Sequence, residues 1–252
     1  MGLELKDRVA IITGAARGIG EATARKLAER GAIVVGLDTQ GDLLKGVVAS
    51  IPKGVAMVVD VTDAEADQRA VKEIHQRFGR IDILVNVAGG ILGAPAGVDK
   101  LSIRDWHQVL DLNLHAPFYL SLAVAPIMTA QRWGRIITVG SGAGRSYSRT
   151  GIIPYTTAKA GVMGLMRQLA VELAPLGVLC NVVSPGLILS PLGRGEWERR
   201  SEAEKADVMS TIAIKRLGDP SEIASVIAFV ASEEASYVVG QTITVDGGHW
   251  ML

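Results

Sequence analysis

The sequence predicts an α/β protein in which helices cover both faces of a parallel sheet, and three observations support this prediction. Short runs rich in β-branched residues alternate with longer helical patterns from one end of the chain to the other. The chain has 252 residues, of which 48% are hydrophobic, and this is enough for a substantial core. No repeat, low-complexity tract or linker divides the sequence, so we expect a single domain over residues 1–252.

The expected strands are short apolar runs bounded by turn residues. In chain order they cover residues 9–12, 33–37, 55–59, 81–85, 135–139, 178–183 and 242–245. The helical patterns between them span residues 18–30, 42–49, 64–78, 102–112, 114–131, 156–174 and 221–232. The longest stretch without a strand, residues 187–219, carries mixed charges. Because it follows a strand, we expect it to form a lid over a site at the carboxyl ends of the strands.

The charge balance and the composition exclude several classes of protein. The chain has 26 basic and 26 acidic residues, so it lacks the basic excess that favours nucleic acid or an anionic membrane as a partner. The sequence contains neither an apolar signal-peptide core nor a run of transmembrane length, and we expect a cytoplasmic protein. One cysteine and four histidines without ligand spacing predict no metal site.

A glycine-rich segment lies between the first strand and the first helix. Glycines allow a sharp turn and a close approach to a pyrophosphate, while the helix that follows offers free N–H groups and the positive end of its dipole. The order of strand, glycines and helix therefore predicts a dinucleotide site. The contacts expected from this segment are Gly14, Arg17, Gly18, Ile19 and Gly20.

The second strand is followed by Asp38, which stands where dinucleotide-binding folds place an acid. A carboxylate there accepts hydrogen bonds from the adenosine ribose and repels a 2′-phosphate, which favours NAD over NADP. Arg17 acts in the opposite direction, because its guanidinium could approach a 2′-phosphate. The prediction is NAD, with NADP as the alternative.

The ends of the third and fourth strands fit the same ligand, since ligands of open α/β sheets lie at the carboxyl ends of strands. Asp60 could accept a bond from the adenine amino group, with the Val61 backbone beside the ring. Asp60 could instead cap the helix over residues 64–78. After the fourth strand come Asn86, Ala88 and Gly89, whose small side chains would let the backbone meet a ribose.

Tyr155 and Lys159 are separated by one helical turn, so in a helix they share a face. Such a pair, taken alone, is typical of a solvated helix surface. A free phenol titrates near pH 10, and a fixed ammonium nearby would lower its pKa. The pair is therefore also a candidate for proton transfer near neutral pH.

Taken together, these motifs resemble those of the short-chain dehydrogenase/reductase family, and the match runs from about residue 5 to residue 250. The matching motifs are Thr13-Gly14-x-x-x-Gly18-x-Gly20, Asn86-x-Ala88-Gly89, Asn113, Ser141, Tyr155-x-x-x-Lys159 and Pro185-Gly186. The resemblance implies a Rossmann-like, doubly wound parallel sheet of seven strands in the order 3-2-1-4-5-6-7. It also implies an NAD(P)-dependent oxidoreductase that interconverts a secondary alcohol and a ketone by hydride transfer.

The same resemblance implies roles for a catalytic group of four residues. Tyr155 would be the general acid/base, and Lys159 would lower its pKa and hold the nicotinamide ribose. Ser141 would hydrogen-bond the substrate oxygen, and Asn113 would hold a water that joins Lys159 to a proton relay. On the nicotinamide side, the resemblance places Pro185, Gly186, Ile188 and Ser190.

The substrate is expected to be a small-molecule alcohol or ketone held by residues 90–94, 142–153 and 187–215, and a small secondary alcohol, a polyol, a hydroxyacyl group and a steroid all stay open. Arg145 and Arg149 could pair with an acidic substrate group or could simply be solvated. Two rival functions stay open. An NADPH-dependent 3-oxoacyl-carrier-protein reductase shares the motifs, although Asp38 counts against it and a basic patch would be expected at its pocket. A dinucleotide-sensing binding protein would lack turnover. The resemblance also implies a homotetramer assembled through the helices of residues 114–131 and 156–174.

Overall fold

The computed structural model describes residues 5–93, 97–148 and 151–251. One sheet runs through this part of the chain in the order β3-β2-β1-β4-β5-β6-β7, and neighbouring strands pair in parallel. The predicted fold class and strand order are confirmed. The strands are β1 (Val9–Thr13), β2 (Ile33–Asp38), β3 (Val55–Val58), β4 (Ile83–Asn86), β5 (Gly134–Val139), β6 (Val178–Pro185) and β7 (Thr242–Val245).

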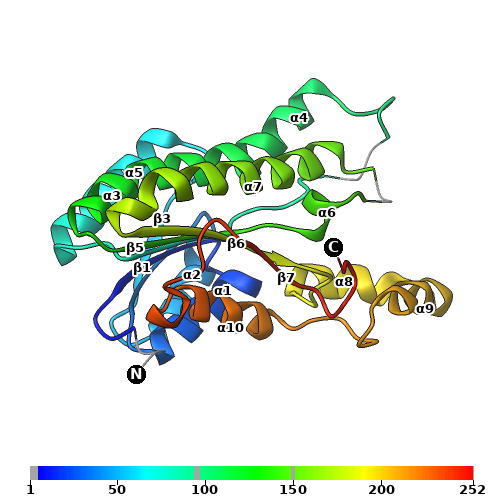
Figure 1. Cartoon of the computed structure of the whole chain (residues 1–252). Helices are drawn as coiled ribbons and strands as arrows, with labels where there is room; N and C mark the ends of the chain where they lie inside the picture. Colours follow the sequence, from blue (N-terminus) through cyan, green and yellow to red (C-terminus); the bar gives the residue numbers. More distant parts are fainter. Residues whose placement is uncertain (1–4, 94–96, 149–150, 252) are drawn as a thin grey trace.

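Helices cover both faces of the sheet (Figure 1). One face carries α1 (Gly18–Glu29), α2 (Gly41–Ala49) and α10 (Pro220–Val230). The other face carries α3 (Ala64–Phe78), α4 (Ile103–Leu110), α5 (Ala116–Ala130) and α7 (Ile153–Leu173). Successive strand residues point to opposite faces, so each strand contributes to two cores. In β1, for example, Ile12 packs in the core beside α1, whereas Ile11 packs in the core beside α5.

The helices α4, α5 and α7 differ in detail from the sequence prediction. The predicted helices over residues 102–112 and 114–131 are joined by a π-helical turn, Asp111–His115, between α4 and α5. A π turn inserts an extra residue into a helical path, and hydrophobic periodicity does not reveal it. α7 begins at Ile153 rather than at residue 156, because Pro154 suits the first turn of a helix. Tyr155 therefore lies in the first turn of α7.

The segment after β6 is mostly helical. It contains α8 (Pro191–Arg199) and α9 (Glu202–Thr211), which lie beyond the same end of the sheet as α6 (Gly142–Arg145), a short helix that the sequence analysis missed (Figure 1). Ile188 and Gly218 form an isolated parallel bridge, so the two ends of the segment lie side by side. Within the described residues, no helix combines the length and apolar character that crossing a membrane requires.

Two aspartates, Asp67 on α3 and Asp82 just before β4, are fully buried, and their surroundings differ. Asp82 accepts hydrogen bonds from Arg8 Nη1 at 3.0 Å, from Arg80 Nη2 at 2.6 Å and from the backbone of β1. Both carboxyl oxygens of Asp67, on α3, have no hydrogen-bond partner among the described residues. Burial raises the pKa of Asp67 to about 8, and the nearby carboxylates of Asp63 and Asp60 add to the rise. Asp67 is thus largely protonated at neutral pH.

We predict that Asp67→Asn reduces the loss of stability that the protein suffers as the pH rises from about 4 to about 8. The pKa of Asp67 lies at about 8 in the folded protein, against an ordinary value of 3.8, so the native state binds more protons in this window and its free energy of unfolding falls as pH rises. Thermal unfolding at pH 5 and pH 8 measures the effect. Asp207→Asn, at an exposed position on α9, is the control. Equal pH dependence in wild type and Asp67→Asn would contradict the prediction.

Candidate active site

The glycine-rich loop joins β1 to α1 and packs tightly against the end of β4. Gly14 and Gly18 have φ angles of 64° and 61°, in the left-handed region that glycine adopts without strain. A Cβ on Gly14 would lie 3.1 Å from the backbone nitrogen and Cα of Ala88. A Cβ on Gly20 would collide with the carbonyl oxygen of Gly14. The loop therefore needs glycine at the predicted positions.

The start of α1 can receive an anion. Arg17 is the N-cap residue, and no side chain among the described residues caps the first turn of this helix. The N–H groups at a helix start have no partner within the helix, and they carry the positive end of the helix dipole. Ile19 lies in this turn and packs against the core beneath it. The glycines and the uncapped helix start together fit the pyrophosphate of a dinucleotide.

Asp38 is held directly against this loop at the end of β2. Its Oδ2 accepts a hydrogen bond from the backbone N–H of Ala16 at 3.1 Å, and its Oδ1 accepts one from Gln40 at 2.9 Å. The half-buried carboxylate therefore has a fixed place beside the glycines. Arg17 belongs to the same loop and is also half-buried. The structure thus brings together the two residues whose opposite effects on a 2′-phosphate the sequence raised.

The hydrogen bonds that follow β3 exclude one of the two roles predicted for Asp60. Asp63, not Asp60, caps α3, because its Oδ1 accepts from the N–H groups of Glu65 at 2.9 Å and Ala66 at 3.0 Å. Asp60 instead accepts from the backbone and the hydroxyl of Thr62. The Asp60 side chain is exposed and the Val61 side chain is buried. Capping α3 is therefore excluded for Asp60, whereas contact with an adenine stays a prediction.

The end of β4 is tied to the end of β1. Thr13 Oγ1 accepts hydrogen bonds from the backbone N–H groups of Val87 and Ala88, both at 2.9 Å. Asn86 is buried and donates to Thr138 Oγ1 at 3.2 Å, while its own Oδ1 has no partner among the described residues. The predicted contacts of β1 and β4 thus converge on one edge of the sheet, and a buried acceptor there is left for a ligand or a water.

Asn113 lies in the π-helical turn and is fully buried. Its Oδ1 accepts from the N–H of Gly90 at 3.0 Å, and its Nδ2 donates to the carbonyl oxygen of Gly90 at 2.8 Å. A Cβ on Gly89 would lie 2.8 Å from Asn113 Oδ1 and 3.2 Å from Lys159 Nζ. The π turn therefore brings Asn113 beside Lys159 and lets it hold the loop after β4.

Tyr155, Ser141 and Lys159 meet between α7 and the end of β5. The hydroxyls of Tyr155 and Ser141 are hydrogen-bonded, and Ser141 is also the N-cap of α6, where its Oγ accepts from Ala143 at 3.2 Å. Lys159 Nζ lies 5.6 Å from the centroid of the Tyr155 ring and donates to the carbonyl oxygen of Val139 at 2.9 Å. The shared helix face expected from the spacing of Tyr155 and Lys159 is confirmed.

The electrostatics of this group differ from the expectation. Burial raises the pKa of Tyr155 above its usual value, and the hydrogen bond with Ser141 acts in the opposite direction. Burial also lowers the pKa of Lys159 to about 8. The expected lowering of the phenol pKa is therefore wrong for these side chains, because desolvation of the phenolate outweighs the hydrogen bond. The phenol is neutral at neutral pH and can donate a proton.

A cavity of about 90 Å³ lies beside Tyr155. Most of its lining is apolar, and it consists of Ile91, Leu92, Gly93, Leu101, Asp105, Val109, Gly151, Ile152, Pro154 and Tyr155. Residues 90–94 and 142–153 were expected here, of which Ala94, Arg149 and Thr150 lie outside the described residues. The contribution of α4 was missed. The sequence predicted residues 102–112 only as a helix, and its helical pattern does not show that Asp105 and Val109 meet this cavity.

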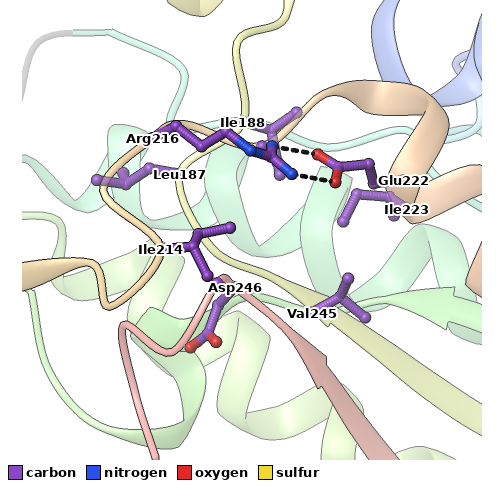
Figure 2. A pocket seen from close by; sticks show the side chains of 10 residues that line it. Leu187, Ile188, Ile214, Arg216, Glu222, Ile223, Val245 and Asp246 are labelled. Atoms are coloured by element: carbon purple, nitrogen blue, oxygen red, sulfur yellow. Dashed lines mark hydrogen bonds and ion pairs between the residues drawn. The ribbon is translucent and has the colours of Figure 1, made fainter. Parts of the chain in front are cut away.

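The segment that follows β6 and the end of β7 border a second cavity, of about 50 Å³ (Figure 2). Ile188 lines it, and Arg216 closes one side by pairing with Glu222 through two hydrogen bonds of 2.7 and 2.8 Å. Pro185 ends β6, and a Cβ on the next residue, Gly186, would lie 2.6 Å from the Cβ of Asp246.

Of the residues expected near a nicotinamide, Ser190 lies beside the glycine loop. Ser190 accepts from the N–H of Gly193 at 3.2 Å as the N-cap of α8. A Cβ on Gly18 would lie 3.5 Å from the Cβ of Ser190. Arg145, expected at the substrate or in solvent, donates to the hydroxyl of Thr244 on β7.

Comparison with known proteins agrees with this geometry. A family model described as "Enoyl-(Acyl carrier protein) reductase" matches residues 14–249. The chain is 37% identical over 255 residues to the 3-oxoacyl-[acyl-carrier-protein] reductase FabG of Salmonella typhimurium, covering 99% of this chain and 100% of the relative. It is 38% identical over 250 residues to FabG of Thermotoga maritima, covering 98% of this chain and 99% of the relative.

A solved structure, the crystal structure of gox2181, superposes with a TM-score of 0.93 at 35% sequence identity, covering 98% of this chain and 97% of that one. The fold, the edge at which the motifs meet and the full-length similarity lead to one assignment. The chain belongs to the short-chain dehydrogenase/reductase family of oxidoreductases, whose members use a nicotinamide dinucleotide.

Proposed function

We propose that the protein reduces the ketone of a 3-oxoacyl thioester to a secondary alcohol. The neutral Tyr155 hydroxyl, hydrogen-bonded to Ser141 at the wall of an apolar cavity, carries this proposal. A protonated phenol can supply the proton that carbonyl reduction consumes. The similarity to 3-oxoacyl reductases over the whole chain supports the substrate class.

When bound, the nicotinamide cofactor supplies the hydride. The hydroxyls of Ser141 and Tyr155 hold the carbonyl oxygen of the substrate. As negative charge develops on this oxygen, Tyr155 Oη donates its proton, so hydride and proton together convert the ketone into an alcohol. The ammonium of Lys159 then stabilises the phenolate that remains, and Asn113 keeps the loop at Gly90 in place beside it.

We propose NAD as the preferred cofactor, with the pyrophosphate at Gly14, Gly18 and the start of α1. The fixed carboxylate of Asp38, beside the glycine loop, supports this preference. At about 4 Å and an effective dielectric of 20, each charge pair between a carboxylate and a 2′-phosphate costs roughly 4 kcal/mol before screening. Arg17 offsets part of this cost.

The apolar cavity supports an acyl chain more clearly than it supports a carrier protein. The only charged side chain in its described lining is Asp105, so the basic patch expected for a carrier-protein reductase is not part of this lining. The proposed lid, residues 187–219, lies beyond the same edge of the sheet. Phe118, Leu122 and Val171 expose apolar side chains on α5 and α7, in support of the predicted homotetramer.

Tyr155→Phe tests the proposed chemistry. We expect turnover of acetoacetyl-CoA to fall by about 10³-fold, because general acid catalysis typically contributes 10²–10⁴-fold. NADH absorbance measures turnover, and NADH fluorescence measures binding, which we expect to be retained. Tyr237→Phe, at a fully exposed tyrosine, is the matched control. Undiminished turnover by Tyr155→Phe would refute the role of Tyr155, and NADH binding without turnover by the wild type would favour a dinucleotide sensor. An acetoacetyl-carrier protein assayed in parallel identifies the carrier.

Asp38→Ala tests the cofactor preference. We expect the ratio of kcat/KM with NADH to kcat/KM with NADPH to fall by about 10²-fold, equivalent to roughly 2.7 kcal/mol, since removal of the carboxylate ends its repulsion of the 2′-phosphate. Asp42→Ala changes an exposed acid on the neighbouring helix and serves as control. A wild type that prefers NADPH, or an unchanged ratio, would count against the proposal.

Lys159→Met separates the catalytic value of the lysine from its effect on stability. The pKa falls from 10.5 to about 8 on burial, and at about 1.4 kcal/mol per unit this costs on the order of 3 kcal/mol below pH 8. The cost is relieved as pH rises from about 8 to 10.5, because the unfolded state binds more protons there. We therefore expect Lys159→Met to be inactive yet more stable at pH 7 in urea denaturation without nucleotide.

The exposed Lys72→Met is the control for this experiment, and we expect it to leave stability nearly unchanged. A Lys159→Met protein that is less stable than the wild type at pH 7 would contradict the prediction.

A further inference from the structure

We infer that Trp250 is a positioning residue that clamps the turn carrying Ser141. This inference rests on the proposed function and adds a residue far along the chain to its machinery. The tail after β7 folds back on Asp246, whose Oδ1 accepts from the N–H of Gly248 at 2.9 Å and whose Oδ2 accepts from the N–H of Trp250 at 2.7 Å. Gly247 and Gly248 adopt φ angles of 65° and 80°, which allow this tight return. The tail therefore has a defined path.

The indole of Trp250 lies directly on the residue that follows Ser141. A Cβ on Gly142 would lie 2.6 Å from the indole Cδ1 and 2.8 Å from its Nε1. His249 stacks on the indole with ring centroids 4.6 Å apart, and Tyr147 meets it in a T-shaped arrangement with centroids 6.0 Å apart. The ring is thus held from two directions while it contacts the backbone of α6.

The opposite side of α6 rests on the helix that carries Tyr155 and Lys159. A Cβ on Gly144 would lie 2.5 Å from the carbonyl carbon of Lys159 and 2.8 Å from the nitrogen of Ala160. α6 is therefore enclosed between the indole at Gly142 and the backbone of α7 at Gly144. Because Ser141 caps α6, this enclosure sets the distance between the Ser141 and Tyr155 hydroxyls.

The same tail also holds the end of the proposed lid. The N–H of Ile214 donates to the carbonyl oxygen of Gly247 at 3.1 Å, and a Cβ on Gly248 would lie 2.7 Å from the Cβ of Ala213. The tail after β7 thus contacts both the C-terminal part of residues 187–219 and the turn that carries Ser141. Loss of the indole would loosen Ser141 against Tyr155 without touching the glycine loop or Asp38.

The first experiment compares Trp250→Ala with Trp250→Phe. We expect Trp250→Ala to lower kcat for acetoacetyl-CoA by about 10²-fold, as a displacement of about 1 Å at a catalytic group can do. We expect the Kd for NADH to change little, because the glycine loop and Asp38, which would hold the pyrophosphate and the adenosine ribose, lie apart from the tail. Trp250→Phe keeps an aromatic ring against Gly142 and restores most of kcat. Tyr237→Ala removes a fully exposed aromatic ring and is the control.

The second experiment is a double-mutant cycle with Gly142→Ala. The added methyl group collides with the indole in the wild type, so Gly142→Ala lowers kcat. In Trp250→Ala the methyl group occupies space that the indole has left, and the double variant is therefore no slower than Trp250→Ala alone. A purely structural role for the tail would lower thermal stability and leave kcat per folded enzyme unchanged.

Wild-type kcat in Trp250→Ala, or additive losses in the cycle, would overturn the inference. If Trp250→Ala does not fold, Trp250→Phe and Gly142→Ala still test the inference. An unchanged kcat in Gly142→Ala then overturns it. A wild type without turnover would overturn the proposed function, and this inference with it. A wild type with turnover and an unaffected Trp250→Ala would overturn this inference alone.

Discussion

Close contact of glycine backbone with its neighbours organises the whole carboxyl edge of the sheet. Gly14 lies on the backbone of Ala88, Gly89 on the side chains of Asn113 and Lys159, and Gly144 on the backbone of α7. At each point a Cβ would occupy space that another chain segment already fills. The spacing between strand ends therefore depends on glycine having no side chain at these positions. The distances between the groups that would bind a nucleotide and move a proton depend on it too.

Burial then sets the chemistry of the groups that these contacts bring together. Removing Tyr155 and Lys159 from water raises the pKa of the phenol and lowers that of the ammonium, because burial favours the neutral form of each group. A neutral phenol suits proton donation to a carbonyl, and a lysine that titrates near pH 8 can respond to charge created beside it. The cost is stability, since a buried ammonium opposes folding at neutral pH, and this is a common exchange at active sites.

Asp67 shows the same physics without a catalytic group beside it. It is a buried acid in the first turn of α3, and no hydrogen bond from a described residue compensates its burial. Asp82 is equally buried, but two arginines and a backbone N–H bind it. The contrast shows that burial alone does not fix the protonation of a carboxyl group, because the partners decide whether charge is tolerated.

The sheet order could be predicted only through the family resemblance, whereas the strands, the glycine loop and the shared helix face of Tyr155 and Lys159 followed from the residues themselves. The strands, the loop and the shared face depend on patterns that are local along the chain, such as apolar runs, glycine positions and helical spacing. Four features became visible only in the folded chain: Asp63 rather than Asp60 caps α3, α4 lines the cavity, a π turn carries Asn113, and Trp250 rests on Gly142. The tertiary structure also reversed the expected pKa shift of Tyr155. Desolvation and packing depend on atoms brought near by distant parts of the chain, and no local pattern encodes which atoms those are.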